Sequence, residues 1–278
     1  MFLVNGECRS QIDISDRGLQ YGDGLFETIA VNNHQAVFWQ EHYHRLQAGC
    51  SRLRIPDPDP DVLLTEINRL CSQSNCARVA VLKLIITRGL GGRGYRQPDS
   101  VTPTRILSLH PYPDYPAHFQ QEGVVARFCE ARLAINPLLA GLKHLNRLEQ
   151  VLARAEWQNT VIQEGIMLDV NGRVIEGTMT NLFYVKAGTL YTAILKESGI
   201  LGITRQKIIE LSRQNGLQVC ELYYTPSDLL QADEVFFSNS LIGIWPAKQI
   251  DQQTFAVGVI TRQIMTWLQQ LREANGAR

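Results

Sequence analysis

The chain has 278 residues, which exceeds one typical domain and is ample for a buried core, so we expect two domains of moderate size. Its 27 basic and 27 acidic side chains cancel, which leaves no overall electrostatic bias toward nucleic acid or an anionic membrane surface. A function on a small-molecule substrate, with no nucleic-acid and no membrane partner, is therefore favoured.

The apolar runs give no sign of a targeting or membrane segment. The first residues, MFLVNGE, place too few apolar side chains before Asn5 for a signal peptide. The run VAVLKLII is interrupted by Lys83 and is far too short to span a bilayer. We expect a cytoplasmic protein.

The cysteines and histidines show no metal-binding pattern. No two cysteines form a CxxC pair, so we predict reduced and mostly structural thiols. His42 and His44 flank Tyr43 on a helix-like segment, where residues two apart do not share a face, so a shared metal is not expected. The cysteines are Cys8, Cys50, Cys71, Cys76, Cys129 and Cys220.

Short strand patterns dominate the first third of the chain. FLVNG, LFETIAV and AVFW read as strands around a turn signal at 32–33, and residues 40–53 read as a helix. Prolines at 56–60 break the chain before apolar residues recur at helical spacing from Leu63 to Leu70. The strand patterns RVAVLKLIITRG and TRILSLH then complete a smaller α/β domain, residues 1–110.

A proline-rich segment separates this domain from the rest. PYPDYPAHFQQ at 111–121 favours an extended linker over a helix or a central strand. Residues 122–278 form the larger domain, in which Asn171-Gly172 between two apolar runs predicts a hairpin. Helices are expected at 146–160, at 204–216 with Gly216 as C-cap, and at 259–274. This order of elements predicts an α/β (α+β) fold.

Two residues of the larger domain stand out chemically. Lys143, in GLKHLNRLEQV, lies just before a helix-like run, and Glu176, in VIEGTMTNLF, lies on a strand-like stretch. Taken singly, each would be read as a solvated side chain. With a phosphate cradle they provide what pyridoxal 5'-phosphate requires: an amine that binds its aldehyde, an acid that keeps its ring nitrogen protonated, and donors for its phosphate.

Two later segments offer such donors. LGITR at 201–205 precedes a helix, so the N–H groups of Ile203 and Thr204 would point at an anion near the positive end of the helix dipole. A polar turn could close the cradle with hydroxyl and backbone donors, and an ordinary turn is the alternative. That turn consists of Ser238, Asn239 and Ser240.

These segments occur in the order found in the fold type IV pyridoxal phosphate enzymes. From SDRGLQYGDGLFETI at 15–29 through SNS at 238–240, the chain resembles that family, and within it the 4-amino-4-deoxychorismate lyases. The resemblance implies a two-domain fold like that of the D-amino-acid aminotransferases, pyridoxal 5'-phosphate as cofactor and a homodimer.

The resemblance also assigns roles to individual residues. Arg45, in HYHRL, matches the family's phosphate-binding arginine. Arg93 and Tyr95 lie in GGRGY, which lacks nucleotide-loop spacing and borders the active site in the lyases, often from the partner subunit. They are candidates for binding a substrate carboxylate, with a merely flexible loop as the alternative. Thr28 is a candidate for relaying a proton to the leaving group, with strand packing as the alternative.

The implied reaction converts 4-amino-4-deoxychorismate to 4-aminobenzoate and pyruvate by β-elimination, with Lys143 removing the C4 proton, and supplies folate synthesis. Two positions differ from the related aminotransferases. Branched-chain aminotransferases generally have tyrosine where this chain has Leu148, and D-amino-acid aminotransferases usually have tyrosine where it has Phe26, which we expect at the substrate. An aminotransferase of the same fold and, more distantly, a non-catalytic pyridoxal phosphate-binding protein stay open as alternatives.

Overall fold

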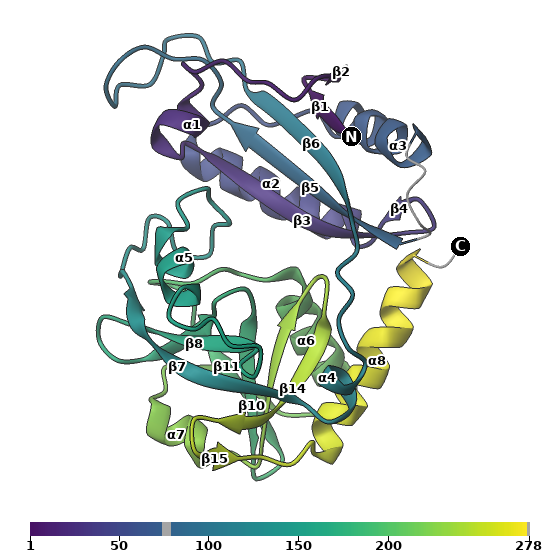
Figure 1. Ribbon diagram of the computed structural model, residues 1–278, viewed down its shortest axis with the longest axis vertical. Helices are drawn as coiled ribbons and strands as arrows, with labels where there is room; N and C mark the ends of the chain where they lie inside the picture. Colours follow the sequence, from purple (N-terminus) through teal and green to yellow (C-terminus); the bar gives the residue numbers. More distant parts are fainter. Residues whose placement is uncertain (74–78, 277–278) are drawn as a thin grey trace. The chain divides into compact units, whose positions relative to one another are not determined.

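The computed structural model describes residues 1–73 and 79–276, which fall into two units (Figure 1). Unit 1 comprises Met1–Pro113, Leu142–Asn146 and the chain end from Arg272, whereas unit 2 comprises Asp114–Gly141 and Arg147–Leu271. Cys76, one of the predicted structural thiols, lies outside the described residues. No helix in the described part of the chain is long and apolar enough to cross a membrane.

Unit 1 is built on an antiparallel six-stranded sheet with the order β2-β1-β6-β5-β3-β4. Its central strands are the runs whose apolar residues predicted strands. The strands are β1 (Phe2–Val4), β2 (Glu7–Cys8), β3 (Gly24–Asn32), β4 (Gln35–Ala36), β5 (Val79–Thr87) and β6 (Thr104–Pro111).

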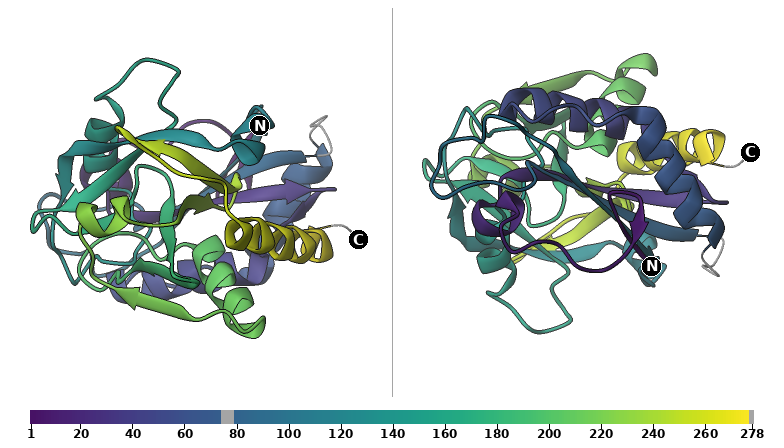
Figure 2. Two further views of the ribbon diagram at one scale, coloured as in Figure 1. Left: turned by 90° about the horizontal axis from the view of Figure 1, so that it is seen from below. Right: turned by 90° about the horizontal axis from the view of Figure 1, so that it is seen from above.

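One face of this sheet is covered by two helices (Figure 2). Helix α2 (Trp39–Leu53) packs on β3 and buries residues at helical spacing such as Leu46 and Cys50. Helix α3 (Pro60–Gln73) packs on β6 and β1. A short helix, α1 (Arg17–Tyr21), precedes β3 and ends at Gly22, which adopts φ +64°. Side chains alternate along β3, so Leu25 and the residues two and four positions after it face α2, whereas Phe26 lies on the opposite face.

Unit 2 contains a nine-stranded sheet with the path β12-β11-β10-β13-β14-β7-β8-β9. Strand β9 also pairs with β10, so the path closes on itself, and β15 pairs with β14. The strands are β7 (Val124–Leu133), β8 (Glu164–Asp169), β9 (Val174–Gly177), β10 (Asn181–Lys186), β11 (Thr189–Ala193), β12 (Val219–Leu222), β13 (Glu234–Asn239), β14 (Gly243–Ile250) and β15 (Gln253–Thr254).

The helices of unit 2 bury one side of these strands. Phe183 of β10 and Phe236 of β13 stack with ring centroids 5.0 Å apart, beneath apolar residues of the long carboxyl-terminal helix such as Ile264 and Leu268. Ile264 and Leu268 both lie on the helix predicted at 259–274. The helices are α4 (His118–Gln121), α5 (Leu148–Arg154), α6 (Ile203–Gln214), α7 (Pro226–Leu230) and α8 (Val259–Gly276).

Local signals placed the turns of unit 2 well. Strands β8 and β9 are antiparallel around the predicted hairpin turn, where Gly172 adopts φ +76°. Asp169 accepts the backbone N–H groups of Asn171 and Arg173 at 2.9 Å, which tightens that turn. Helix α6 ends at Gln214 with Asn215 as its C-cap, and Gly216, predicted as the C-cap, follows one residue later at φ +79°.

Two expected elements differ in the structure. Helix α5 is much shorter than the predicted helix at 146–160: it ends at Arg154, and near the end of the predicted span Asn159 accepts the N–H groups of the two residues at 161–162 and forms a turn. The segment 111–121, expected to be extended, contains α4, where Phe119 lies 5.3 Å from the ring of Trp245. In the second segment, packing of Phe119 against Trp245 accompanies a short helix that the proline pattern did not predict.

The structure also groups Lys143 differently from the sequence. We assigned this residue to the larger domain, whereas Leu142–Asn146 belongs to unit 1. The reason is backbone pairing with β3: Phe26 N–H donates to the Lys143 carbonyl at 2.9 Å, and Leu145 N–H donates to the Gly24 carbonyl at 3.0 Å.

Candidate active site

The predicted site residues fall into two groups, one in each unit. In unit 1, the Lys143 side chain is half-buried, and its Nζ lies 4.3 Å from the centroid of the Phe26 ring. Asn146 donates to the Gly22 carbonyl at 3.0 Å and closes off this segment. The lysine is therefore held over one aromatic ring by the strand pairing, rather than being carried on a free loop.

The same sheet face carries Thr28 and a second lysine. Thr28 is two residues beyond Phe26 on β3, half-buried, and opposite Lys83 in the register of β3 with β5. The Lys83 Nζ lies 5.9 Å from the centroid of the Phe26 ring. Two amines and a hydroxyl thus share one face, and the lysine with the closer approach to the ring is Lys143.

The opposite face of β3 carries a buried charge cluster that the sequence did not assign. Glu27 is buried and accepts from Arg45 Nε at 2.8 Å and from Arg45 Nη2, so the arginine fork holds both carboxylate oxygens. The His42 ring donates from Nδ1 to the same carboxylate at 2.6 Å. Arg45, predicted to bind phosphate, is therefore fixed by Glu27.

Burial and pairing pull the Glu27 ionisation in opposite directions. Desolvation raises the pKa of this carboxyl, but Arg45 and His42 outweigh it and hold the pKa at about 2. Desolvation lowers the pKa of His42 although Glu27 opposes this, and the charges of Arg45 and Lys143 add to the lowering. A charged Glu27 between apolar Leu25 and Ile29 was the sequence signal for this cluster, because an acid at a buried strand position requires a partner.

In unit 2, three residues on neighbouring strands form one row. Asn181 of β10 lies directly opposite Glu176 of β9 and directly opposite Ser238 of β13. Residues directly opposite each other point to the same face of a sheet. Glu176 is buried and accepts the Ile200 N–H at 2.8 Å, while Asn181 donates to the Ile200 carbonyl at 2.9 Å.

The start of α6 lies against this row. A Cβ at Gly202, the N-cap residue, would be 2.0 Å from Asn181 Oδ1, so only glycine allows this approach. No side chain caps the helix start, where Ile203 and Thr204 are buried. The predicted donors of the helix start thus border the Asn181 side chain, in the same row as Glu176 and Ser238.

The turn residues contribute unequally. Ser238 Oγ is buried and has no hydrogen-bond partner within the described residues, so it is an available donor. The Asn239 side chain instead serves the fold: it donates to the Met179 carbonyl at 3.2 Å and accepts the N–H groups of Leu241 and Ile242. Ser240 is half-buried beside them.

Glu164 is a buried acid that the sequence analysis missed. It accepts from Thr178 Oγ1 at 2.5 Å, from Thr178 N–H at 3.0 Å and from Thr180 Oγ1 at 2.8 Å. Burial raises the pKa of this carboxyl although these hydrogen bonds oppose the rise. The glutamate thereby fixes the turn that joins Glu176 to Asn181.

The remaining predicted residues lie on the glycine-rich loop of unit 1. Arg93 and Tyr95 are exposed between β5 and β6, and 88% of Tyr95 is accessible. The rings of Tyr95 and Tyr21 pack against each other in an edge-type geometry, with centroids 5.7 Å apart. The loop therefore contacts α1 through Tyr95, while Arg93 and most of Tyr95 stay exposed to solvent.

Comparison with known proteins gives consistent matches. Residues 24–250 match the family model "Amino-transferase class IV". An aminodeoxychorismate lyase from Vibrio harveyi is 40% identical over 268 residues, which is 95% of this chain and 98% of the relative. A D-alanine aminotransferase from Bacillus licheniformis is 31% identical over 270 residues, 96% of this chain and 93% of the relative.

The solved structures include a similar lyase. The crystal structure of 4-amino-4-deoxychorismate lyase from Pseudomonas aeruginosa superposes with a TM-score of 0.92 and 43% identity, covering 99% of this chain and all of that one.

Proposed function

Because the chain belongs to the class IV aminotransferase family, we propose that it is a 4-amino-4-deoxychorismate lyase that depends on pyridoxal 5'-phosphate. The observation that carries the proposal is that lyases match the chain over nearly its whole length and more closely than the D-alanine aminotransferase does. The products would be 4-aminobenzoate and pyruvate, in a step that supplies folate synthesis. The predicted family and the predicted fold are both confirmed by these matches.

The residues of unit 2 fit the cofactor. Within the described residues, no side chain caps the start of α6 and the Ser238 hydroxyl has no partner, so both can offer donors to the phosphate. Glu176 is a buried carboxylate in the same row, suited to hold the ring nitrogen protonated. Ile203 and Thr204 would give backbone N–H groups, with Ser238 and Ser240 as further donors and Asn239 holding their turn.

The residues of unit 1 would carry the chemistry. When bound, pyridoxal phosphate supplies an electron sink for the carbanion at the reacting carbon. Lys143 would hold the cofactor through its aldehyde, and the same amine would serve as the base that takes the C4 proton of the substrate. Thr28, on the same face as Phe26, would relay a proton to the departing enolpyruvyl oxygen. Arg45, which is hydrogen-bonded to Glu27, would contribute to phosphate binding.

The substrate carries two carboxylates, so its pocket requires cations or hydroxyl donors beyond those that bind the cofactor. Arg93 and Tyr95 suit this task because they are exposed on a glycine-rich loop. Phe26 would contact the ring of the substrate. Their assignment to substrate binding is part of the proposal.

A homodimer and a cytoplasmic location are also part of the proposal. Helix α5 exposes three apolar side chains at the spacing of one helix face, namely Leu148, Val151 and Leu152. An exposed apolar helix face is typical of a surface that another chain covers. We expect Val151→Glu to shift sedimentation toward the monomer, whereas Val161→Glu, an exposed residue beyond the helix, should not.

The first experiment identifies the lysine. The holoprotein is reduced with borohydride, digested and mapped by mass spectrometry, and the pyridoxyl group is expected on Lys143. Lys83 is the internal control, because its amine faces the same ring at a longer distance. Lys143→Ala should lower the rate by orders of magnitude and Lys83→Ala far less. A pyridoxyl group on Lys83 would contradict the proposal.

The second experiment identifies the reaction. Purified protein is supplied with aminodeoxychorismate, and 4-aminobenzoate and pyruvate are measured. An aminotransferase is the second candidate, favoured by the D-alanine aminotransferase relative. Steady transfer from D-alanine or leucine to 2-oxoglutarate, with no 4-aminobenzoate formed, would replace the lyase by that candidate. A bound chromophore without turnover on any amine would instead indicate a non-catalytic protein.

The third experiment tests whether Arg93 serves the partner's site. Mixed dimers of Arg93→Ala and Lys143→Ala chains contain one unimpaired site if Arg93 acts in trans. Such dimers should keep about half the wild-type activity, taking the two sites as independent. Activity no higher than the mean of the two mutant homodimers would place Arg93 at its own chain's site or at none.

A further inference from the structure

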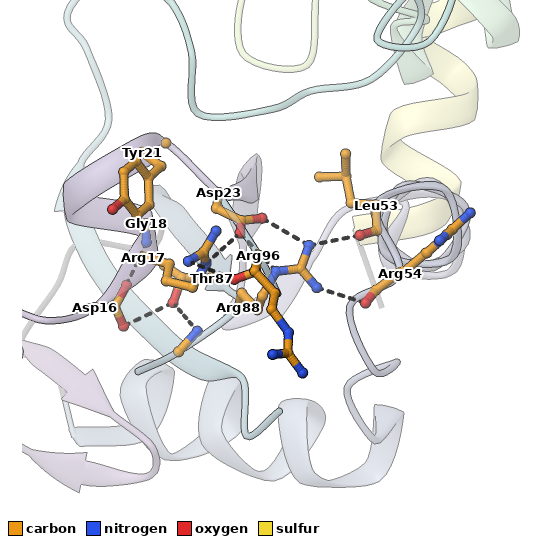
Figure 3. Close-up of polar contacts among 12 residues, drawn as sticks. Asp16, Arg17, Gly18, Tyr21, Asp23, Leu53, Arg54, Thr87, Arg88 and Arg96 are labelled. Atoms are coloured by element: carbon orange, nitrogen blue, oxygen red, sulfur yellow. Dashed lines mark hydrogen bonds and ion pairs between the residues drawn. The ribbon is translucent and has the colours of Figure 1, made fainter. Parts of the chain in front are cut away.

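Arg17 is buried at the start of helix α1, outside every role assigned so far. Only 3% of the residue is exposed. Its Nε donates to Asp23 at 3.0 Å (Figure 3). Its Nη1 donates to the Gly94 carbonyl at 3.0 Å. The guanidinium carbon lies 4.8 Å from the centroid of the Tyr21 ring. One side chain therefore joins a carboxylate, an aromatic ring and the backbone of the glycine-rich loop.

Asp23 is shared with a second buried arginine. Arg88 Nε donates to Asp23 at 2.7 Å, and its two terminal nitrogens donate to the carbonyls of Leu53 and Arg54 at 2.7 Å (Figure 3). Hydrogen bonds and charge from the two arginines lower the pKa of Asp23 although its burial opposes this. Both arginines bind Asp23, but their other partners differ. Arg88 donates to carbonyls at the end of α2, whereas Arg17 donates to the glycine-rich loop.

Further contacts attach the loop to α1. Arg17 N–H donates to the Gly89 carbonyl at 2.9 Å, and Gly94 N–H donates to the Tyr21 hydroxyl at 3.2 Å. Tyr95 packs against Tyr21. Every one of these contacts involves α1, so the path of the loop on either side of Arg93 depends on where Arg17 and Tyr21 lie.

The glycines of the loop support this reading. A Cβ at Gly91 would lie 2.5 Å from Arg17 Cδ and 2.8 Å from Arg17 Cγ, so any side chain there would displace the arginine. A Cβ at Gly92 would meet nothing within 4 Å. Gly91 is therefore required by the fit of Arg17 against the loop, and its neighbour Gly92 is not.

We infer that Arg17 is a positioning residue, which holds the loop so that Arg93 and Tyr95 are already arranged when the substrate carboxylate arrives. This inference rests on the proposed function for its link to the substrate. A loop that is ordered beforehand does not have to be ordered on binding, so less of the interaction energy is lost. A buried arginine also orients better than a lysine, since its planar fork donates in several fixed directions at once.

The test compares four variants of the holoprotein. Arg17→Lys keeps the positive charge but removes the planar guanidinium. Gly91→Ala adds a methyl group that would collide with the Arg17 side chain. Gly92→Ala is the matched control within the loop, and Arg88→Lys is the matched control on Asp23. Each protein is treated with trypsin under native conditions, cleavage after Arg93 and Arg96 is followed by mass spectrometry, and KM and kcat are measured.

Arg17→Lys and Gly91→Ala should be cleaved in the loop about tenfold faster than wild type. Their KM should rise about tenfold, equivalent to about 1.4 kcal/mol, with kcat changed by less than about twofold. Gly92→Ala should match wild type in both measurements, and Arg88→Lys should lower the melting temperature without this change in KM. Cofactor absorbance should be retained in all four.

Two outcomes would overturn the inference. Loop cleavage at the wild-type rate in both Arg17→Lys and Gly91→Ala would show that Arg17 does not hold the loop. Faster cleavage with an unchanged KM would show that the held loop does not position a substrate group. Failure of the proposed function gives a different result, because the wild-type protein would then form no 4-aminobenzoate while the cleavage rates could still be compared.

Discussion

Replacement of Glu27 by glutamine should remove a large part of the stability of unit 1. The carboxyl has a pKa of about 2 in the folded protein, against 4.5 for an ordinary glutamate, and this difference is worth about 3 kcal/mol. The variant also leaves the half-buried Arg45 without its anionic partner, and breaking an ion pair whose carboxylate is buried costs up to about 3–5 kcal/mol. Both routes give a loss of about 3 kcal/mol at neutral pH.

The pH dependence has a defined sign. Because the folded pKa is depressed, the stabilisation is fully present above about pH 4.5 and is lost as the pH falls toward about 2. By about pH 3 only about half of it should remain. The stability difference between wild type and Glu27→Gln should therefore shrink on acidification, whereas titrations common to both proteins cancel in the comparison.

The assay is urea unfolding of both apoproteins at pH 7 and pH 3, followed by tryptophan fluorescence. The matched control is Glu66→Gln, which breaks a pair on the same sheet face whose partner, Arg105, is more exposed. Because Arg105 keeps more of its side chain in solvent than Arg45 does, that control should cost less than Glu27→Gln. If Glu27→Gln costs no more than Glu66→Gln at pH 7, or if its cost does not fall with pH, the buried carboxylate is not held ionised as argued.

Three further predictions concern the core, the thiols and a glycine. Phe183→Ala should cost about 3–5 kcal/mol in urea unfolding, because its stacked ring is fully buried. Burial raises the pKa of Cys129 to about 12, so a thiol reagent at pH 8 should modify the exposed Cys8 first, which peptide mapping would show. Gly89→Ala should lower the melting temperature more than Gly216→Ala, since both have positive φ but only the former would press a Cβ to 1.9 Å from a backbone carbonyl.

The sequence alone determined the elements whose signal is local. The apolar runs of β5, β8 and β9 predicted strands because strand pairing buries such residues, and the turn at Gly172 was predicted because that backbone favours glycine. The order of the motifs around Lys143 and Glu176 was enough to predict the family, which the comparisons confirm. Each of these signals is contained within a short stretch of chain.

Only the tertiary structure decided which distant residues meet. It placed Glu27 with His42 and Arg45, fifteen and eighteen residues away, and Arg17 with Gly94, seventy-seven residues away. An unpaired charge could not be buried at these positions, so each contact depends on a partner that sheet pairing and helix packing bring into place. Strand register likewise aligned Glu176, Asn181 and Ser238 in one row, a relation between three strands that no single segment of sequence encodes.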